Sequence, residues 1–316
     1  MSWQNAPSLS KLTAAQHGGK RGAHLWGVDV KGILHSIYQK TPGGEWSNWM
    51  GPDWAGPGFP KQVYELAATQ GKDGRVTLFT LNTMRHLYCI TQDDPDGDWT
   101  GWKELEWNGA PNGLLTKLTA VQRGVKELGV ELWAITNAGE IYSSHQWLKE
   151  ARWFHGWYVW PSPPDTQFIE LAAARQHNGH VALWGIDSKL QLWCMTENSP
   201  DSPTPPIGWG SWEGPNWQGA PRLRNIAAVR GAEGAIFWGI DENYRMIHNW
   251  QNGQGKWNGW SHLNWMGAPH SYELTAAGQN NNCVQLWAIT LMGKLSSIAQ
   301  IAPSCNWQQH WSDRDE

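Results

Sequence analysis

A short apolar segment recurs six times along this chain of 316 residues. It first reads LTAAQ, and its copies begin at Leu12, Leu66, Leu118, Leu171, Ile226 and Leu274. Neighbouring copies lie 48 to 55 residues apart. An interval of this length is typical of architectures in which each repeat is one supersecondary unit and adjacent units bury one another's apolar faces.

Further landmarks follow each copy in a constant order. An aromatic segment such as LWGVD is centred on Trp26, Phe79, Trp133, Trp184, Trp238 and Trp287. A polar residue comes next, at Gln39, Gln92, Gln146, Glu197, Gln251 and Gln300. A tryptophan pair follows, at Trp46/Trp49, Trp99/Trp102, Trp153/Trp157, Trp209/Trp212, Trp257/Trp260 and Trp307/Trp311. A closing tryptophan ends five copies, at Trp54, Trp107, Trp160, Trp217 and Trp265.

The missing end of the sixth copy is found at the start of the chain. The segment Trp3–Pro7, which reads WQNAP, matches the WNGAP and WMGAP segments that end other copies. We therefore predict that residues 1–8 complete the sixth repeat. An array whose last unit is completed by its first residues is a closed ring, since an open solenoid would need capping repeats instead.

The repeat itself is predicted to be all-β. Segments such as ELWAIT and HLYCIT are rich in residues that suit strands, and turn signals such as NAGE and DPDGD separate them. We expect four strands per repeat, near residues 11–16, 23–28, 33–39 and 46–54 in the first copy. Six such units in a closed ring predict a six-bladed β-propeller, with residues 1–316 as one domain of four antiparallel strands per blade.

Most of the tryptophans are expected to pack between blades, because aromatic side chains supply the volume that a blade needs on both faces. We assign this role to the aromatic residue of the second strand and to the closing tryptophan, including Trp3. The second tryptophan of each pair is expected to pack on the opposite face from the first. His17, His177 and His180 are expected in solvated loops. The turn residues Asp29, Asn82, Asp187 and Asp241 are expected to bond turn backbone.

The recurrent polar residue and the first tryptophan of each pair are the candidate binding residues, since both are expected at the same rim. An indole can hold the apolar face of a sugar, while glutamine offers a donor and an acceptor. The candidate sugar-binding residues are Gln39, Trp46, Gln92, Trp99, Gln146, Trp153, Glu197, Trp209, Gln251, Trp257, Gln300 and Trp307. The alternative is that each glutamine bonds the backbone of a neighbouring blade and each tryptophan packs beneath a loop.

The composition of the chain argues against two classes of partner, nucleic acids and membranes. The net charge of −4 argues against nucleic acid as a partner, and the sequence has no apolar run long enough to predict membrane insertion. Four dispersed cysteines predict free thiols, and the start of the chain has no visible signal peptide. We expect a cytoplasmic protein, or one released without a conventional signal peptide. No metal or cofactor motif occurs, although a Ca²⁺ ion in the central channel and a homo-oligomer both stay open.

The segments ELWAITNAGEIYSSHQ and QGKWNGW resemble the repeats of the tectonin-like lectins and of the Photorhabdus/Psathyrella lectin families. The resemblance spans the whole chain and implies a sugar-binding propeller. It implies fucose, O-methylated sugars or N-acetylglucosamine as ligands, carried by glycoproteins or glycolipids. Shallow sites repeated around one rim would gain strength through avidity on a surface dense in glycans.

Three functions are compatible with these features. The first is a multivalent lectin without catalysis. The second is a protein-interaction scaffold that uses the same ring and binds no sugar. The third is a propeller glycosidase, which would need a pair of carboxylates at its centre. Glu65, Glu170 and Glu273 precede the first strand in three copies, and this resembles a repeat pattern more than a unique catalytic site.

Overall fold

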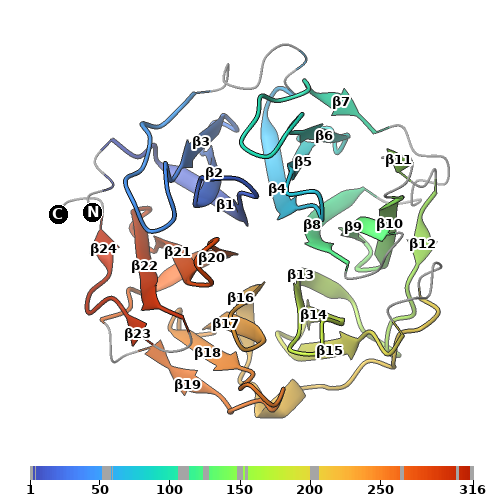
Figure 1. The fold of residues 1–316 in the computed structure, drawn as a ribbon. Coiled ribbons are helices and arrows are strands. Elements are labelled where there is room, and N and C mark those ends of the chain that lie inside the picture. Colours follow the sequence, from blue (N-terminus) through green and yellow to red (C-terminus); the bar gives the residue numbers. More distant parts are fainter. Residues whose placement is uncertain are drawn as a thin grey trace.

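In the computed structural model, six antiparallel sheets surround a central axis (Figure 1). The structure describes residues 3, 5–51, 58, 60–105, 114–123, 128–147, 152–153, 156–199, 206–263, 267–303 and 306–313. Each sheet is one blade, and the blades are numbered here in chain order. The protein is a six-bladed β-propeller, as the repeats predict.

Three strands of every blade follow one pattern. The innermost strands are β1 (Leu9–Gln16), β4 (Val63–Gln70), β8 (Leu115–Gln122), β13 (Phe168–Arg175), β16 (Leu223–Arg230) and β20 (Ser271–Gly278). The second strands are β2 (Ala23–Asp29), β5 (Val76–Asn82), β9 (Leu128–Thr136), β14 (Val181–Asp187), β17 (Ala235–Asp241) and β21 (Val284–Thr290). The third strands are β3 (Leu34–Tyr38), β6 (Leu87–Thr91), β10 (Ile141–Trp147), β15 (Leu192–Thr196), β18 (Met246–Trp250) and β22 (Leu295–Ala302).

The fourth strand is short or broken, which differs from the expected strand over residues 46–54. It consists of β7 (Lys103–Glu104), β11 (Arg152–Trp153) with β12 (Tyr158–Val159), β19 (Ser261–His262), and β23 (Asn306–Trp307) with β24 (Ser312–Asp313). In the described parts of blades 1 and 4, isolated bridges such as Gln39 with Trp46 and Glu197 with Trp209 take its place. The 3₁₀ turn η2 (Trp217–Gly219) follows in blade 4.

The tryptophan pair explains this irregularity. In five blades both members pack against the same apolar cluster, so the expectation that they point to opposite faces is wrong. Regular alternation would separate residues three positions apart. In blades 2 and 5 the residue before the second tryptophan is a glycine with positive φ, 89° at Gly101 and 94° at Gly259. This conformation interrupts the ladder and returns the second indole to the first one's face.

The apolar cores lie between the blades. Each of the six core clusters combines residues from two neighbouring sheets. The cluster between blades 6 and 1 contains Trp3 and Leu9 together with Trp287 and Leu295, and β20 lies beside β1. The ring is therefore closed, and Trp3 takes part in the closure, its Nε1 donating to Ser297 Oγ at 3.2 Å.

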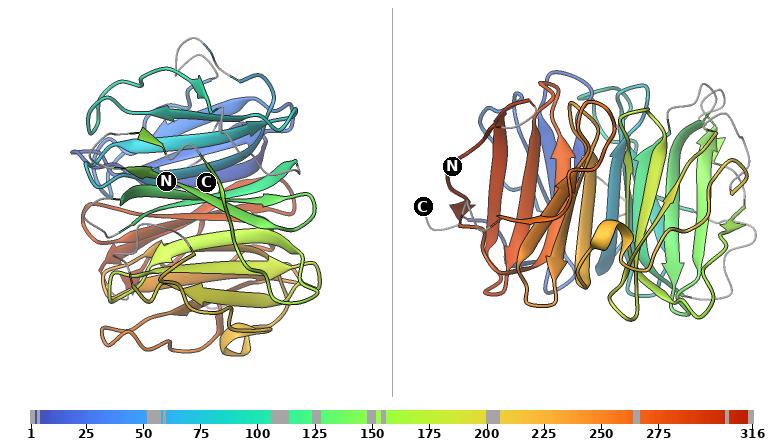
Figure 2. Two further views of the ribbon diagram at one scale, coloured as in Figure 1. Left: turned by 90° about the vertical axis from the view of Figure 1, so that its right-hand side faces the viewer. Right: turned by 90° about the horizontal axis from the view of Figure 1, so that it is seen from below.

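The loops collect at two rims (Figure 2). Loops joining the first to the second strand and the third to the fourth strand lie at one rim, which we call the glutamine rim. Turns joining the second to the third strand lie at the other. There Asp29, Asn82, Asp187 and Asp241 accept hydrogen bonds from turn backbone, which confirms their expected role.

Within the described residues, no helix has the length and apolar character needed to cross a membrane. Cys89, Cys194 and Cys283 are buried free thiols, and burial raises the pKa of the Cys89 thiol to about 11. Cys305 lies outside the described residues.

Candidate functional site

In five blades the first tryptophan of the pair packs edge-on against the second-strand tryptophan of the preceding blade. Ring centroids are 5.8 Å apart for Trp46–Trp287, 6.0 Å for Trp99–Trp26, 5.9 Å for Trp209–Trp133, 5.9 Å for Trp257–Trp184 and 6.1 Å for Trp307–Trp238. Interplanar angles of 77° to 89° are the favourable T-shaped arrangement. These first tryptophans are only partly buried, so each combines packing with a surface that reaches solvent.

The closing tryptophans complete these contacts from the other side. Trp3 lies 5.3 Å from Trp46, and both Trp160–Trp209 and Trp217–Trp257 are 4.8 Å apart. All three closing residues are buried, as are the second-strand aromatics, so their packing roles are confirmed. Trp54, Trp107 and Trp265 lie outside the described residues, as does the side chain of Trp153.

The recurrent glutamines point inward. In five blades a side-chain oxygen of this polar residue accepts a hydrogen bond from the backbone N–H at the start of its own second strand, at 2.9 to 3.1 Å. The acceptors are the amide oxygens of Gln39, Gln92, Gln251 and Gln300 and a carboxylate oxygen of Glu197. These five residues are 0 to 8% exposed. Gln146 is partly buried and pairs with Trp153 in the β10–β11 ladder. The expected placement beside the first tryptophan at the rim is observed.

The same side chains also reach the preceding blade. Gln39 Nε2 donates to Gln285 Oε1 at 3.3 Å, and Gln251 Nε2 donates to Gln176 Oε1 at 2.9 Å. Gln92 Nε2 lies 3.5 Å from His17 Nδ1. Each of these amides therefore joins two blades at the glutamine rim. This supports a positioning role for the glutamines, and their direct contact with a sugar stays a prediction.

His17 is fully buried, so its expected place in a solvated loop is wrong. Its Nε2 lies 2.9 Å from His24 Nδ1, and its Nδ1 lies 3.1 Å from an Asp96 carboxylate oxygen on blade 2. Burial lowers the pKa of His17 to about 4, while Asp96 opposes the shift. The imidazole therefore packs neutral between two blades. His177 is exposed, as expected, and His180 is partly exposed.

A buried charge cluster marks the interface of blades 3 and 4. Arg123 pairs with Glu131 at 3.2 Å and with Glu197, and none of the three side chains is exposed. Burial raises the pKa of Glu131 to about 7, although the charge of Arg123 opposes the rise. Sequence reasoning missed this cluster. The signal was available, because Glu197 replaces glutamine where Arg123 appears in the preceding repeat.

The free energy of unfolding of Glu131→Gln, relative to that of the unmodified protein, is expected to increase as the pH rises from 4.5 to 7. An unfolded glutamate ionises near pH 4.5 and the folded one near pH 7, so the native protein loses up to about 3 kcal/mol across this window. Glutamine cannot ionise, and Arg123 keeps Glu197 as its partner. Urea unfolding of both proteins at several pH values measures the difference. A pH-independent difference would contradict the assignment.

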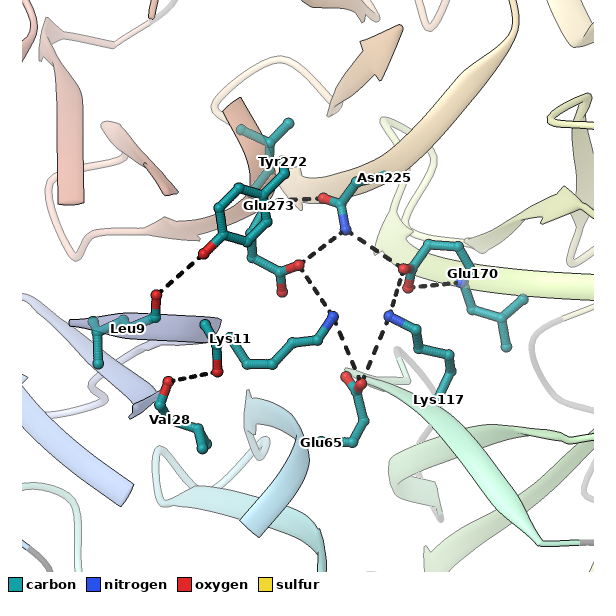
Figure 3. A network of polar contacts seen from close by, with 12 residues as sticks. Leu9, Lys11, Val28, Glu65, Lys117, Glu170, Asn225, Tyr272 and Glu273 are labelled. Atoms are coloured by element: carbon teal, nitrogen blue, oxygen red, sulfur yellow. Dashed lines mark hydrogen bonds and ion pairs between the residues drawn. The ribbon is translucent and has the colours of Figure 1, made fainter. Parts of the chain in front are cut away.

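Charged side chains also meet on the axis of the ring (Figure 3). The residue before each apolar repeat copy is, in order, Lys11, Glu65, Lys117, Glu170, Asn225 and Glu273. Lys11 lies 3.1 Å from Glu273 and 4.0 Å from Glu65, and Lys117 lies 2.7 Å from Glu170 and 3.6 Å from Glu65. Asn225 Nδ2 closes the circle with Glu170 and Glu273 at 3.5 and 3.4 Å.

These glutamates lie inside β4, β13 and β20 and converge, which corrects the expectation that they merely precede the inner strands. Burial alone would lower the pKa of Lys117, but the charges of Glu170, Glu65 and Glu273 raise it well above its ordinary value. The three carboxylates are thus engaged by ammonium and amide groups. Within the described residues, no group of three or more His, Cys, Asp or Glu side chains could hold a metal ion.

Comparison with known proteins identifies solved structures with a similar fold. No protein-family model matches the chain, and no curated protein matches it. Among solved structures it is similar to the fungal lectin of Aleuria aurantia, described as a six-bladed β-propeller with a novel fucose recognition mode, at 14% identity, a TM-score of 0.64 and 96% of each chain covered. The chain shares its fold with six-bladed lectins.

Two further structures extend the comparison. AofleA from Arthrobotrys oligospora has 13% identity and a TM-score of 0.63, with 96% of this chain and 86% of that chain covered. A lectin from Burkholderia pseudomallei has 18% identity and a TM-score of 0.58, with 96% and 84% covered. The fold of this chain is therefore shared over 96% of its length with proteins to which its sequence is at most 18% identical.

Proposed function

We propose that this protein is a multivalent lectin that binds glycans at the glutamine rim and performs no catalysis. Fucosylated, O-methylated or N-acetylglucosamine-type glycans on glycoproteins or glycolipids are the proposed ligands. The observation that carries the proposal is the repetition of a partly exposed indole beside polar loops. At three blade interfaces this indole, from Trp46, Trp209 or Trp257, is fixed by two other tryptophans.

The physical argument rests on preorganisation. Trp257 is held between Trp184 and Trp217, so its indole does not have to be ordered when a ligand arrives. A rigid aromatic wall beside a few polar groups is the usual composition of a small-ligand site. Gln251 would fix this wall by joining blades 4 and 5. The similarity of the fold to lectins solved with fucosides supports the same proposal.

Trp257→Leu is expected to weaken binding of α-methyl fucoside at the interface of blades 4 and 5 by about tenfold, or about 1.4 kcal/mol. Leucine keeps part of the apolar packing but removes the aromatic face. Titration followed by NMR reports each interface separately, and a glycan array reports the loss of avidity. Trp311→Leu is the matched control, because Trp311 is buried in the cluster between blades 5 and 6.

Unchanged fucoside binding by Trp257→Leu would remove the first tryptophans as the sugar contact. Gln251→Met separates the two roles of the glutamine, since loss of positioning lowers stability as well as binding. An array without any bound glycan would instead favour the scaffold function. The polar residues that meet at the interfaces differ, with histidines between blades 1 and 2 and an arginine–glutamate cluster between blades 3 and 4, as an asymmetric scaffold would require.

A further inference from the structure

The central channel widens toward the glutamine rim. An alanine occupies the same position in all six inner strands, at Ala14, Ala68, Ala120, Ala173, Ala228 and Ala276. Because this side chain is short, a cavity of about 190 Å³ remains between these alanines and the ends of the strands. The last residues of the strands surround its mouth: Gln16, Gln70, Gln122, Arg175, Arg230 and Gly278.

Two of these six residues are cations from adjacent blades. Arg175 ends β13 and Arg230 ends β16. Arg175 Nε donates to the carbonyl oxygen of Gly179 at 3.2 Å, and Arg230 Nη1 donates to the carbonyl oxygen of Gln176 at 2.7 Å. Both guanidinium groups are therefore held over the same loop of blade 4, which joins β13 to β14. Their positions are fixed by neutral backbone acceptors.

The two charges are not compensated locally. Within the described part of the chain, neither guanidinium forms an ion pair with a carboxylate. Burial lowers the pKa of Arg175, and the charge of Arg230 lowers it further, whereas Glu197 opposes the shift. The Glu197 carboxylate is already bound by Arg123 and by the backbone N–H of Val181. An anion between the two arginines would relieve their repulsion.

We propose that the mouth of the channel at the glutamine rim binds a carboxylate or sulfate group carried by an acidic glycan, with Arg175 and Arg230 as its cations. A guanidinium has five N–H donors in a planar fork that matches such oxyanions, and each described backbone contact uses one of them. The cavity gives room for the anion, and Gln16, Gln70 and Gln122 line the same cavity, with Gln16 Nε2 donating to Asn280 Oδ1 and Gln70 Nε2 donating to the Gly74 carbonyl oxygen. The glycan part of this inference rests on the proposed function, whereas the anion site does not.

Three matched probes test the site: galactose, galacturonate and galactose 6-sulfate. Their binding is followed through the Nε–Hε signals of the arginines in ¹H–¹⁵N NMR spectra. Both anionic sugars are expected to shift the signals of Arg175 and Arg230 and to bind about tenfold or more tightly than galactose. Their affinity is expected to fall several-fold as the salt rises from about 0.05 M to about 0.3 M, since partly exposed charges are screened.

Arg175→Gln and Arg230→Gln are each expected to lower the affinity for the anionic sugars about tenfold. Arg224→Gln is the matched control, because Arg224 lies at the opposite end of β16 and stacks over Tyr244. Equal binding of galactose and the two anionic sugars would overturn the inference, as would unchanged binding by Arg230→Gln. Inorganic sulfate that binds as tightly as galactose 6-sulfate would leave an anion site and overturn its glycan part.

The same measurements separate this inference from the proposed function. Fucoside binding at the tryptophans, together with silent arginine signals, would overturn the anion site and leave the lectin. Arginine-dependent binding of the anionic sugars, together with a glycan array on which no neutral glycan is bound, would support the anion site and overturn neutral-sugar recognition by the rim.

Discussion

Trp287→Ala is expected to lower the free energy of unfolding by about 3–5 kcal/mol, the usual range for truncating a buried aromatic residue. Trp287 is fully buried and packs at 5.8 Å against Trp46, in the cluster that joins blade 6 to blade 1. Its loss would open a cavity where the ring closes. Urea unfolding followed by far-ultraviolet circular dichroism measures the change.

Trp287→Phe provides the control, because Phe79 occupies the same position in blade 2 without loss of the fold. We expect this variant to lose less than half as much stability as Trp287→Ala, since the phenyl ring refills most of the volume. If Trp287→Ala costs less than about 1 kcal/mol, the interface between blades 6 and 1 does not carry the closure of the ring.

Lys117→Met is expected to destabilise the protein by a similar amount, about 3–5 kcal/mol. Lys117 is the shared partner of Glu65 and Glu170, and its removal would leave two buried carboxylates without their closest cation. The loss should shrink at acidic pH, because burial raises the pKa of Glu65 and this carboxylate can then take up a proton. Unfolding at neutral and acidic pH measures both effects.

The triple variant Lys117→Met, Glu65→Gln and Glu170→Gln should recover most of the lost stability, because it removes the stranded charges as well as the cation. Lys103→Met, on the exposed strand β7, should change stability by no more than about 0.5 kcal/mol. A triple variant as unstable as Lys117→Met alone would show that packing of the lysine stem, and not charge, holds the axis together.

The architecture could be predicted from the sequence because its determinants are local and repeated. In the first repeat the expected strands over residues 11–16, 23–28 and 33–39 correspond to Leu9–Gln16, Ala23–Asp29 and Leu34–Tyr38. The fourth strand could not be predicted, because the spacing of Trp99 and Trp102 does not reveal the positive φ of the glycine between them. Backbone conformation at that glycine decides which face the second indole takes.

The site was predicted only in outline. The sequence places Gln39 beside Trp46 at the rim, but the direction of an amide at a strand end depends on partners far away in the chain. Gln39 is held by Gln285, which belongs to the sixth repeat. The alternation of lysine and glutamate can be read from the residue before each repeat copy. That these side chains form ion pairs could not be predicted until the six inner strands were known to face one another.

Ser297 contacts the first residue and the last strand that the structure describes. The first described residue, Trp3, donates to its hydroxyl, and the last described strand, β24, pairs with β22 at the same residue through Ser312. Joining the two ends of the chain by a short linker and opening it between β12 and β13 would keep every blade and change only where synthesis starts. Such a circular permutant would begin with blade 4 and end with blade 3, and the contacts of Trp3 and Ser312 with Ser297 would then lie in the middle of its sequence.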